Sequence, residues 1–311
     1  MITLPNKVKQ FLVFLIKLVV VVAAFYFIYN QLVSNTKLDW VRFKFLFLAK
    51  VTFWNVFFII SLSVLNRYLE ILKWQNLVSS MQSISLFEAT KQVLAALTAG
   101  IFTPNGVGEY AGKALFYPKA ITKKIIFLNL ICNGVQMIIT IFFGTIGLFV
   151  LGFYKIGSFI VVLLFGAIAL FMFTKKFKIR GYSIESLVVH LTQIPKKIHQ
   201  KNIVLGLLRY LTFTHQFYFI FLIFGVSAPY LSMLASKSCI YFLSSALPSF
   251  QFLDFAVKGS VAVYYLKLLN INEWLVIIVT TLMWFLNVVV PIGIGSFFVM
   301  GFRLKDKPKS E

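Results

Sequence analysis

Long apolar runs with very few charges dominate this chain, and they restrict it to a small set of folds. Six of them reach the roughly 18–20 residues that a helix needs to cross a bilayer core. Their approximate ranges are 11–33, 45–65, 125–151, 157–174, 203–224 and 274–300. Hydrophobic residues make up 60% of the chain and charged residues 13%, whereas about a quarter of a soluble domain is charged. The sequence therefore predicts an all-α integral membrane protein.

Two further apolar segments, 86–116 and 232–268, are each interrupted near the middle by a proline and then by charged residues. Proline removes a helical hydrogen bond and kinks or breaks a helix. Each segment is therefore expected to be a hairpin that enters and leaves by one face, or a pair of short spans. The chain would then have about six full spans plus two Pro-broken hairpins, or eight spans.

Basic residues between the spans predict the orientation, because loops rich in Lys and Arg stay on the cytoplasmic side of a membrane. The loop 175–202 carries seven basic residues and one acid, and the tail after residue 302 is also basic. Both termini are therefore expected in the cytoplasm. The formal net charge of +21 is explained by these loops and by attraction to lipid surfaces, so no nucleic-acid partner is expected.

With these assignments each half of the chain crosses the membrane three times, and the two hairpins enter from opposite faces. An odd number of crossings inverts the second half, as in many transporters. Repeat 1 would cover 1–155, with spans 11–33 and 45–65, hairpin 86–116 and span 125–151. Repeat 2 would cover 156–311, with span 157–174, basic loop 175–202, span 203–224, hairpin 232–268, span 274–300 and the basic tail.

One charged motif occurs in both interrupted segments. Glu109 and Lys113 in the first segment correspond to Asp254 and Lys258 in the second, at an offset of 145 residues. Charges are costly inside a bilayer and are usually functional there. In each copy the acid and the lysine are four residues apart, so they share one helix face. They are candidates for a polar substrate path, or for buried salt bridges that fix the hairpins.

The first copy begins with Thr103, Pro104 and Asn105 and continues through Gly106 and Gly108. Pro and Gly interrupt the helix, and irregular backbone at membrane depth is tolerated only when it is buried in protein or lines a water-filled cavity. A helix that restarts there would direct its N-terminal amides at the cavity, where an anion is favoured. The second copy lacks these glycines, so its backbone break should be milder.

A charged cluster follows the second predicted span. Arg67 and Lys73 each lie three residues from Glu70, close enough to pair with it on a helix. The cluster is either an interfacial anchor or a basic rim that meets a phosphate headgroup.

Polar stripes mark two of the predicted spans. Asn129, Asn133, Gln136 and Thr140 follow steps of four, three and four, which places them within about 40° on one helix face. The last span has a parallel pattern that includes Asn287. Such stripes face other helices or water and rarely lipid, so they either line a cavity or join helices.

Two more polar residues, Arg209 and His215, lie in the predicted span 203–224. Arg209 is near the cytoplasmic end, where a long side chain reaches out to the membrane surface. His215 is deeper and is either a packing residue or a proton-coupling group.

Sequence motifs for nucleotide binding, zinc proteolysis and serine hydrolysis are absent. The two cysteines, Cys132 and Cys239, have no neighbouring Cys or His at metal-ligand spacing. The sequence thus predicts no cofactor, no metal site and a transporter rather than an enzyme.

Three stretches together carry a resemblance: 66–74, the Thr103–Pro104…Gly108–Glu109 core, and 248–258. They resemble the flippase-like transmembrane region of lysylphosphatidylglycerol synthases, also called uncharacterised protein family 0104. The resemblance implies a multi-pass protein of the bacterial cell (inner) membrane that moves a modified phospholipid between leaflets. The second motif departs from the Gly-rich form common in that family, so the substrate contacts are expected to differ. The soluble aminoacyl transferase domain of the fused enzymes has no counterpart here.

Three functions remain open from the sequence. The first is a lipid flippase for an anionic or modified (glyco)phospholipid or another lipid-linked substrate. The second is a non-catalytic membrane subunit that scaffolds a lipid-modifying or glycan-synthesis enzyme. The third is an integral membrane transferase, for which Glu109 and Asp254 would have to supply the carboxylates.

Overall fold

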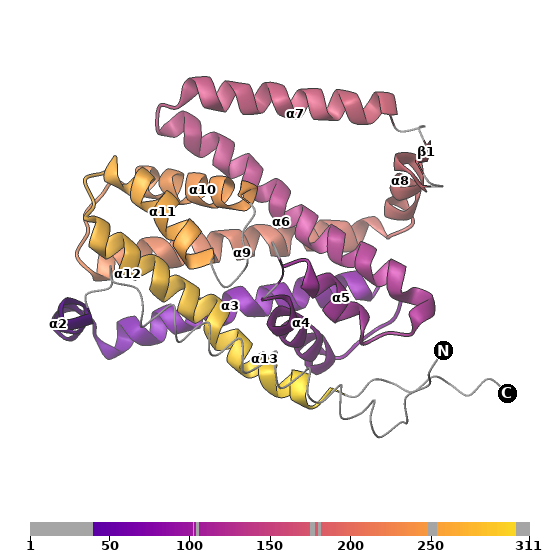
Figure 1. The fold of residues 1–311 in the computed structure, drawn as a ribbon, viewed down its shortest axis with the longest axis horizontal. Helices are drawn as coiled ribbons and strands as arrows, with labels where there is room; N and C mark the ends of the chain where they lie inside the picture. Colours follow the sequence, from indigo (N-terminus) through magenta and orange to yellow (C-terminus); the bar gives the residue numbers. More distant parts are fainter. Residues whose placement is uncertain are drawn as a thin grey trace, which may run out of the picture.

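The structure is a computed structural model that describes residues 40–101, 103, 106–174, 178–179, 182–247 and 254–302. The described elements are helical apart from one hairpin of two-residue strands, β1 (Lys178–Ile179) and β2 (Tyr182–Ser183) (Figure 1). The α-helices are α2 (Trp40–Lys50), α3 (Phe53–Val78), α4 (Leu86–Gly100), α5 (Gly108–Ala114), α6 (Thr122–Val150), α7 (Tyr154–Thr174), α8 (Ile184–Thr192), α9 (Lys196–Ile223), α10 (Tyr230–Ala246), α11 (Asp254–Lys267), α12 (Glu273–Trp284) and α13 (Val290–Met300). A 3₁₀ turn, η1 (Lys119–Ile121), precedes α6, and a π-helical turn, η3 (Phe285–Val289), joins α12 to α13.

Four helical segments among the described residues are long and apolar enough to cross a membrane. They are Phe53–Val78, Lys119–Val150, Tyr154–Thr174 and Glu273–Met300. This result confirms the all-helical prediction and is consistent with a membrane protein. The predicted span 203–224 covers most of the 28-residue helix α9 and ends one residue beyond it, and α9 is not one of the four. The predicted span 11–33 lies outside the described residues.

The predicted span 45–65 is wrong in its bounds, because its helix is broken at residues 51–52. Thr52 caps the new helix: its Oγ1 accepts the Asn55 amide at 3.3 Å, which satisfies one of the donors left open at a helix start. The helix α3 then continues to Val78. The charged cluster 67–73 is therefore inside this helix and does not follow it.

Both interrupted segments fold as two helices with a break between them. Segment 86–116 forms α4 and α5, and segment 232–268 lies within α10 and α11. A capping box fixes the start of α4, because the Ser85 hydroxyl accepts the Glu88 amide and the Glu88 carboxylate accepts the Ser85 amide. The predicted basic loop 175–202, the connection between two predicted spans, contains β1, β2, α8 and the first residues of α9.

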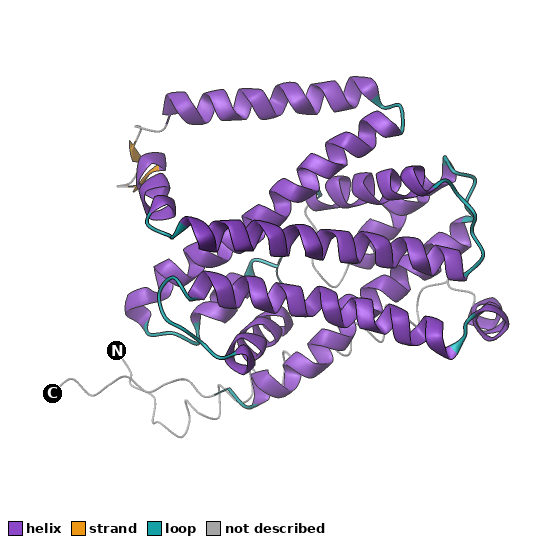
Figure 2. Cartoon of the chain, turned by 180° about the vertical axis from the view of Figure 1, so that it is seen from behind, coloured by secondary structure: helices purple, strands orange, loops and turns teal. Residues whose placement is uncertain are grey.

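The helices bury two large apolar clusters. One contains Trp74, Leu77 and Ile125, and the other contains Phe217, Phe221 and other residues from the second half of the chain. The helices α3, α6 and α9 contribute side chains to both clusters. On each of these helices, buried polar residues lie between the part that packs in one cluster and the part that packs in the other. A polar layer therefore crosses the middle of the bundle. Seen from behind, α7 lies apart from the bundle (Figure 2), and its side chains are mostly exposed.

Candidate functional site

A row of buried polar residues runs along one face of α3. Ser63, Asn66, Glu70 and Lys73 are spaced three, four and three residues apart, so they share one face of the helix. All four are buried. Buried polar groups require partners on neighbouring helices, because an unsatisfied polar group in an apolar environment is costly. The partners come from α6, α9 and η3.

Glu70 is the centre of an ion-pair cluster. Its Oε2 lies 3.1 Å from Arg209 Nη1 and 3.6 Å from Lys73 Nζ. On α6, Gln136 Oε1 accepts from the same two cations, at 3.3 Å from Arg209 and 3.4 Å from Lys73. The Cys132 thiol donates weakly to Glu70 Oε1 at 3.8 Å. Side chains from α3, α6 and α9 thus converge on one carboxylate, and Arg209 points into the protein as well as toward its surface.

The π-helical turn η3 provides the second part of the network. Asn287 Oδ1 accepts from Asn66 Nδ2 at 2.8 Å, and Asn287 Nδ2 donates to Gln216 Oε1 at 3.0 Å. The Asn287 carbonyl accepts from Arg67 Nη2 at 2.6 Å. Gln216 in turn donates to Ser63. A π turn changes the pairing of backbone carbonyls and is frequent at functional sites, and here one such carbonyl binds an arginine.

Thr103 and Gly108 shape the turn between α4 and α5. The Thr103 hydroxyl donates to the Gly100 carbonyl at 2.6 Å and accepts the Gly108 amide at 2.7 Å. Gly106 has a φ of 69°, a conformation that glycine adopts without steric cost, and its carbonyl accepts the Glu109 amide at 2.9 Å. The expectation that these amides point at an anion is therefore wrong, because the turn itself uses them.

Lys113 binds to side chains on neighbouring helices. Its Nζ donates to Asn129 Oδ1 at 2.7 Å and lies 4.5 Å from the centre of the Trp74 ring. The lysine is buried, so the amide and the ring replace its lost hydration. Glu109 is half-buried and lies close enough to Arg67 to attract it.

The polar stripe on α6 contacts other helices, which is one of the two alternatives that the sequence leaves open. Asn129 contacts α5, and Asn133 Nδ2 donates to Tyr110 OH at 3.2 Å. Gln136 contacts α3 and α9. Thr140 differs, because its hydroxyl donates to the Gln136 carbonyl of its own helix at 2.9 Å. The stripe therefore joins the α5 motif to the Glu70 cluster.

The second copy of the motif lies against aromatic side chains. Lys258 Nζ is 5.9 Å from the centre of the Tyr241 ring. Lys237 on α10 is buried, and its Nζ lies 4.2 Å from the ring centres of Phe217 and Tyr241 and 4.9 Å from that of Phe213. The sequence analysis missed Lys237, whose only signal was a lysine in the middle of an apolar helix.

The remaining candidates do not join the network or lie outside the described residues. His215 Nε2 lies 2.6 Å from Tyr230 OH, away from the Glu70 cluster. Pro104, Asn105 and the side chain of Asp254 are not described.

Gln216 is a network residue that the sequence analysis missed. Asn202, Arg209 and Gln216 follow each other at intervals of seven residues, which is almost two helical turns. This spacing is the signal that could have identified Gln216, because it places Gln216 on the same helix face as Arg209.

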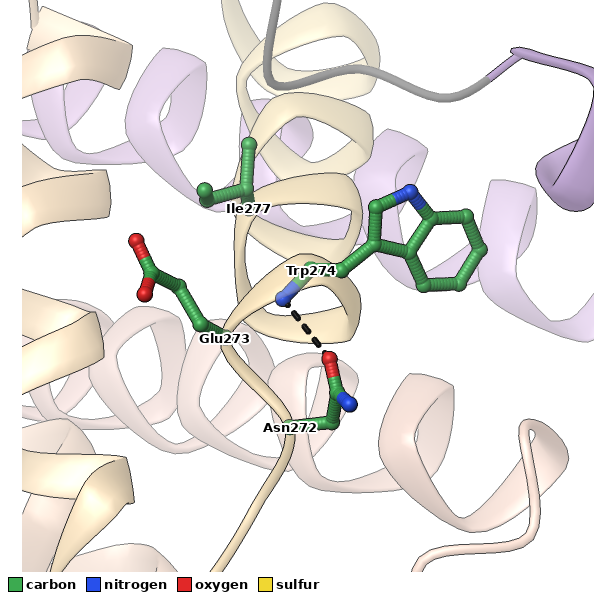
Figure 3. A pocket seen from close by; sticks show the side chains of 4 residues that line it. All are labelled: Asn272, Glu273, Trp274 and Ile277. Carbon is green, nitrogen blue, oxygen red and sulfur yellow. Dashed lines mark hydrogen bonds between the residues drawn. The ribbon is translucent and has the colours of Figure 1, made fainter.

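A shallow pocket lies at the start of α12 and is separate from the network (Figure 3). It is lined by Asn272, Glu273, Trp274 and Ile277. Asn272 Oδ1 accepts the Trp274 amide at 2.9 Å and so caps the helix. The pocket is about 20 Å along the helix from Asn287, at 1.5 Å per residue.

Comparison with known proteins identifies no relative: no protein-family model, no curated protein and no solved structure matches the chain. Within the part of the chain that the structure describes, no group of three or more His, Cys, Asp or Glu side chains could hold a metal ion.

Proposed function

We propose that this protein is a lipid translocase that moves an anionic or modified (glyco)phospholipid, or another lipid-linked substrate, between the leaflets of a membrane. The headgroup would pass along the polar layer, and the acyl chains would stay in the bilayer. The observation that carries this proposal is the ion-pair cluster of Glu70, Lys73 and Arg209 in the middle of apolar helices. Intramembrane charges of this kind mark substrate pathways in transporters.

The path would include both copies of the charged motif. Lys113 is linked through Asn129 and α6 to the Glu70 cluster, and Lys258 lies beside Tyr241 on the opposite hairpin. We further propose a multi-pass protein of the bacterial cell membrane with both termini in the cytoplasm. The resemblance to the transmembrane region of lysylphosphatidylglycerol synthases supports this placement.

Two inverted repeats form part of the same proposal, and the helix pairing supports them. In the proposed repeat, α4 corresponds to α10, and α6 corresponds to α12–α13. The helix α6 packs on α10, and α13 packs on α4. A Cβ on Gly147 of α6 would lie 2.7 Å from the Ala235 carbonyl of α10, and a Cβ on Gly295 of α13 would lie 2.3 Å from the Leu94 carbonyl of α4. One two-fold axis would relate both contacts.

The test is lipid translocation in proteoliposomes, with labelled phospholipids that differ in headgroup. We expect movement above that of protein-free vesicles for at least one anionic headgroup. Glu109→Gln and Lys113→Gln should each slow it about tenfold or more, because a hydrogen bond to a charged group contributes about 1.5–3 kcal/mol. Lys155→Gln, at an exposed position in the first turn of α7, removes a positive charge without touching the path and should leave the rate unchanged.

Full activity in both motif variants would contradict the proposed path. An absence of movement for every headgroup, from folded protein, would contradict the translocase and favour the scaffold. The scaffold predicts stable co-purification with a lipid-modifying or glycan-synthesis enzyme.

A further inference from the structure

Four cations surround Glu70 in the polar layer. Arg209 and Lys73 pair with it directly, and Arg67 and Lys113 also lie within its electrostatic reach. Glu109 acts on Arg67 as a second carboxylate. Among the described side chains of this cluster, two carboxylates face four cations, which is an excess of two positive charges. The neutral partners of these cations, such as Asn129 and the Asn287 carbonyl, accept hydrogen bonds but carry no negative charge. Buried charge is costly unless it is balanced, so a cluster of this composition favours a further anion.

The polar atoms without a partner in this cluster are mostly donors. Arg67 Nε, Arg209 Nε and Asn129 Nδ2 are buried and have no hydrogen-bond acceptor. A guanidinium has no acceptor capacity, and an amide nitrogen donates only. The missing partner must therefore accept hydrogen bonds. Two acceptors of the same cluster, Asn66 Oδ1 and Glu70 Oε2, also have no hydrogen-bond donor, so the three unpartnered donors favour an anionic ligand through their number and through the excess of positive charge.

Access to the cluster is provided by its two arginines. Lys73 and Lys113 are buried, at 0% and 1% exposure, but the Arg209 side chain is 25% exposed and Arg67 is half-buried. Two planar guanidinium groups match the oxygens of a phosphate, which they bind through paired hydrogen bonds. The lysines behind them add charge at greater depth.

We infer that Arg67, Lys73, Lys113 and Arg209 form a binding site for a phosphate group with two negative charges, a phosphate monoester or a diphosphate. This inference rests on the proposed function in one respect: if the protein is a lipid translocase, the phosphate group belongs to the headgroup of a lipid. A free phosphate or diphosphate has the same chemistry, and the experiment distinguishes the two sources.

The first arm measures binding to the purified full-length protein in a non-ionic detergent. The probes are inorganic phosphate and diphosphate, with sodium chloride at matched ionic strength as the reference, and the readout is the shift in thermal unfolding with probe concentration. We expect saturable stabilisation by both probes. Arg67→Gln and Arg209→Gln should each weaken binding at least tenfold. Lys201→Gln removes an exposed charge from the same helix as Arg209 and should bind as the wild type does.

The second arm uses the protein in nanodiscs of phosphatidylcholine that contain phosphatidic acid, a phosphate monoester, or phosphatidylglycerol, a diester. Preferential stabilisation by phosphatidic acid, reduced in Arg209→Gln, assigns the site to a lipid headgroup. Stabilisation by the soluble probes alone assigns it to a free oxyanion. Equal stabilisation by the monoester and the diester would overturn the dianion assignment.

Absence of stabilisation in both arms would overturn the site, and so would unchanged binding by both arginine variants. If a glutamine variant does not fold, Arg209→Lys keeps the charge and removes the Nε donor, and it should still bind less tightly than the wild type. Binding in detergent requires no transport. Binding without translocation would therefore support the phosphate site and contradict the translocase. Translocation without binding would support the translocase and contradict the phosphate site.

Discussion

Arg209 on α9 and Glu70 on α3 form a 3.1 Å ion pair that joins the two halves of the chain. The two helices pack against each other, and Gln136 of α6 accepts a hydrogen bond from the same guanidinium. Glu70 also holds Lys73. One carboxylate thus balances cations from both halves, and the stability of the polar layer depends on it.

Glu70→Gln should destabilise the protein by about 3 kcal/mol, because it leaves Lys73 and Arg209 in a buried site without a counter-charge. The measurement is the free energy of unfolding in detergent. Glu185→Gln in α8 removes an exposed carboxylate and should change stability by no more than about 0.5 kcal/mol. Equal stability of the two variants would show that Glu70 does not hold the cluster together.

Gly295→Ala should destabilise the contact between α13 and α4. A Cβ at this position would lie 2.3 Å from the Leu94 carbonyl and from Thr98 Oγ1, so the two helices would have to separate. Overpacking of this kind costs about 1–3 kcal/mol. Gly293→Ala is the matched control on the same helix: a Cβ there meets nothing within 4 Å. The control should be neutral or slightly stabilising, since alanine favours a helix by up to about 1 kcal/mol over glycine.

Hydropathy was sufficient to predict the helical class and the approximate positions of α6, α7 and α12–α13, because an apolar run of span length has few alternative structures. It failed at α2 and α3, where the same apolar run is divided by the cap at Thr52. A hydropathy profile does not register a helix cap, in which a side chain such as that of Thr52 binds a backbone amide. It also placed 67–73 after a span, whereas charged residues continue α3 when partners on other helices neutralise them.

The spacing of polar residues along one helix identified the network residues of α6, since the steps of Asn129, Asn133 and Gln136 place them on a shared face. It did not identify their partners. The pairing of Lys113 with Asn129 and the contact of Asn287 with Asn66 depend on which helices pack together. That information is in the tertiary structure and not in the spacing along one helix.

The hydrogen bond from Asn66 to Asn287 should be measurable as a coupling energy between α3 and η3. The two amides are 2.8 Å apart and buried. In a double-mutant cycle with Asn66→Leu and Asn287→Leu, the coupling in unfolding free energy should be about 1 kcal/mol. Thr90→Val, at a hydroxyl that bonds only its own helix, should show no coupling to Asn287→Leu. Additive effects of the two leucine substitutions would indicate that this contact does not stabilise the bundle.

Cys132 provides a chemical reporter of the sign of the potential in the polar layer. It lies 3.8 Å from Glu70, and Cys239 is the only other cysteine, so Cys239→Ser leaves a single thiol. Cys132 is buried, so modification requires the reagent to enter the polar layer, and if the cations dominate there, a negatively charged methanethiosulfonate reagent should modify Cys132 faster than a positively charged one of similar size. We expect a ratio of about ten at low salt that falls as the salt concentration rises. Arg209→Gln should lower the ratio, and Lys201→Gln should not. A faster reaction with the positively charged reagent would mean that Glu70 and Glu109 outweigh the four cations.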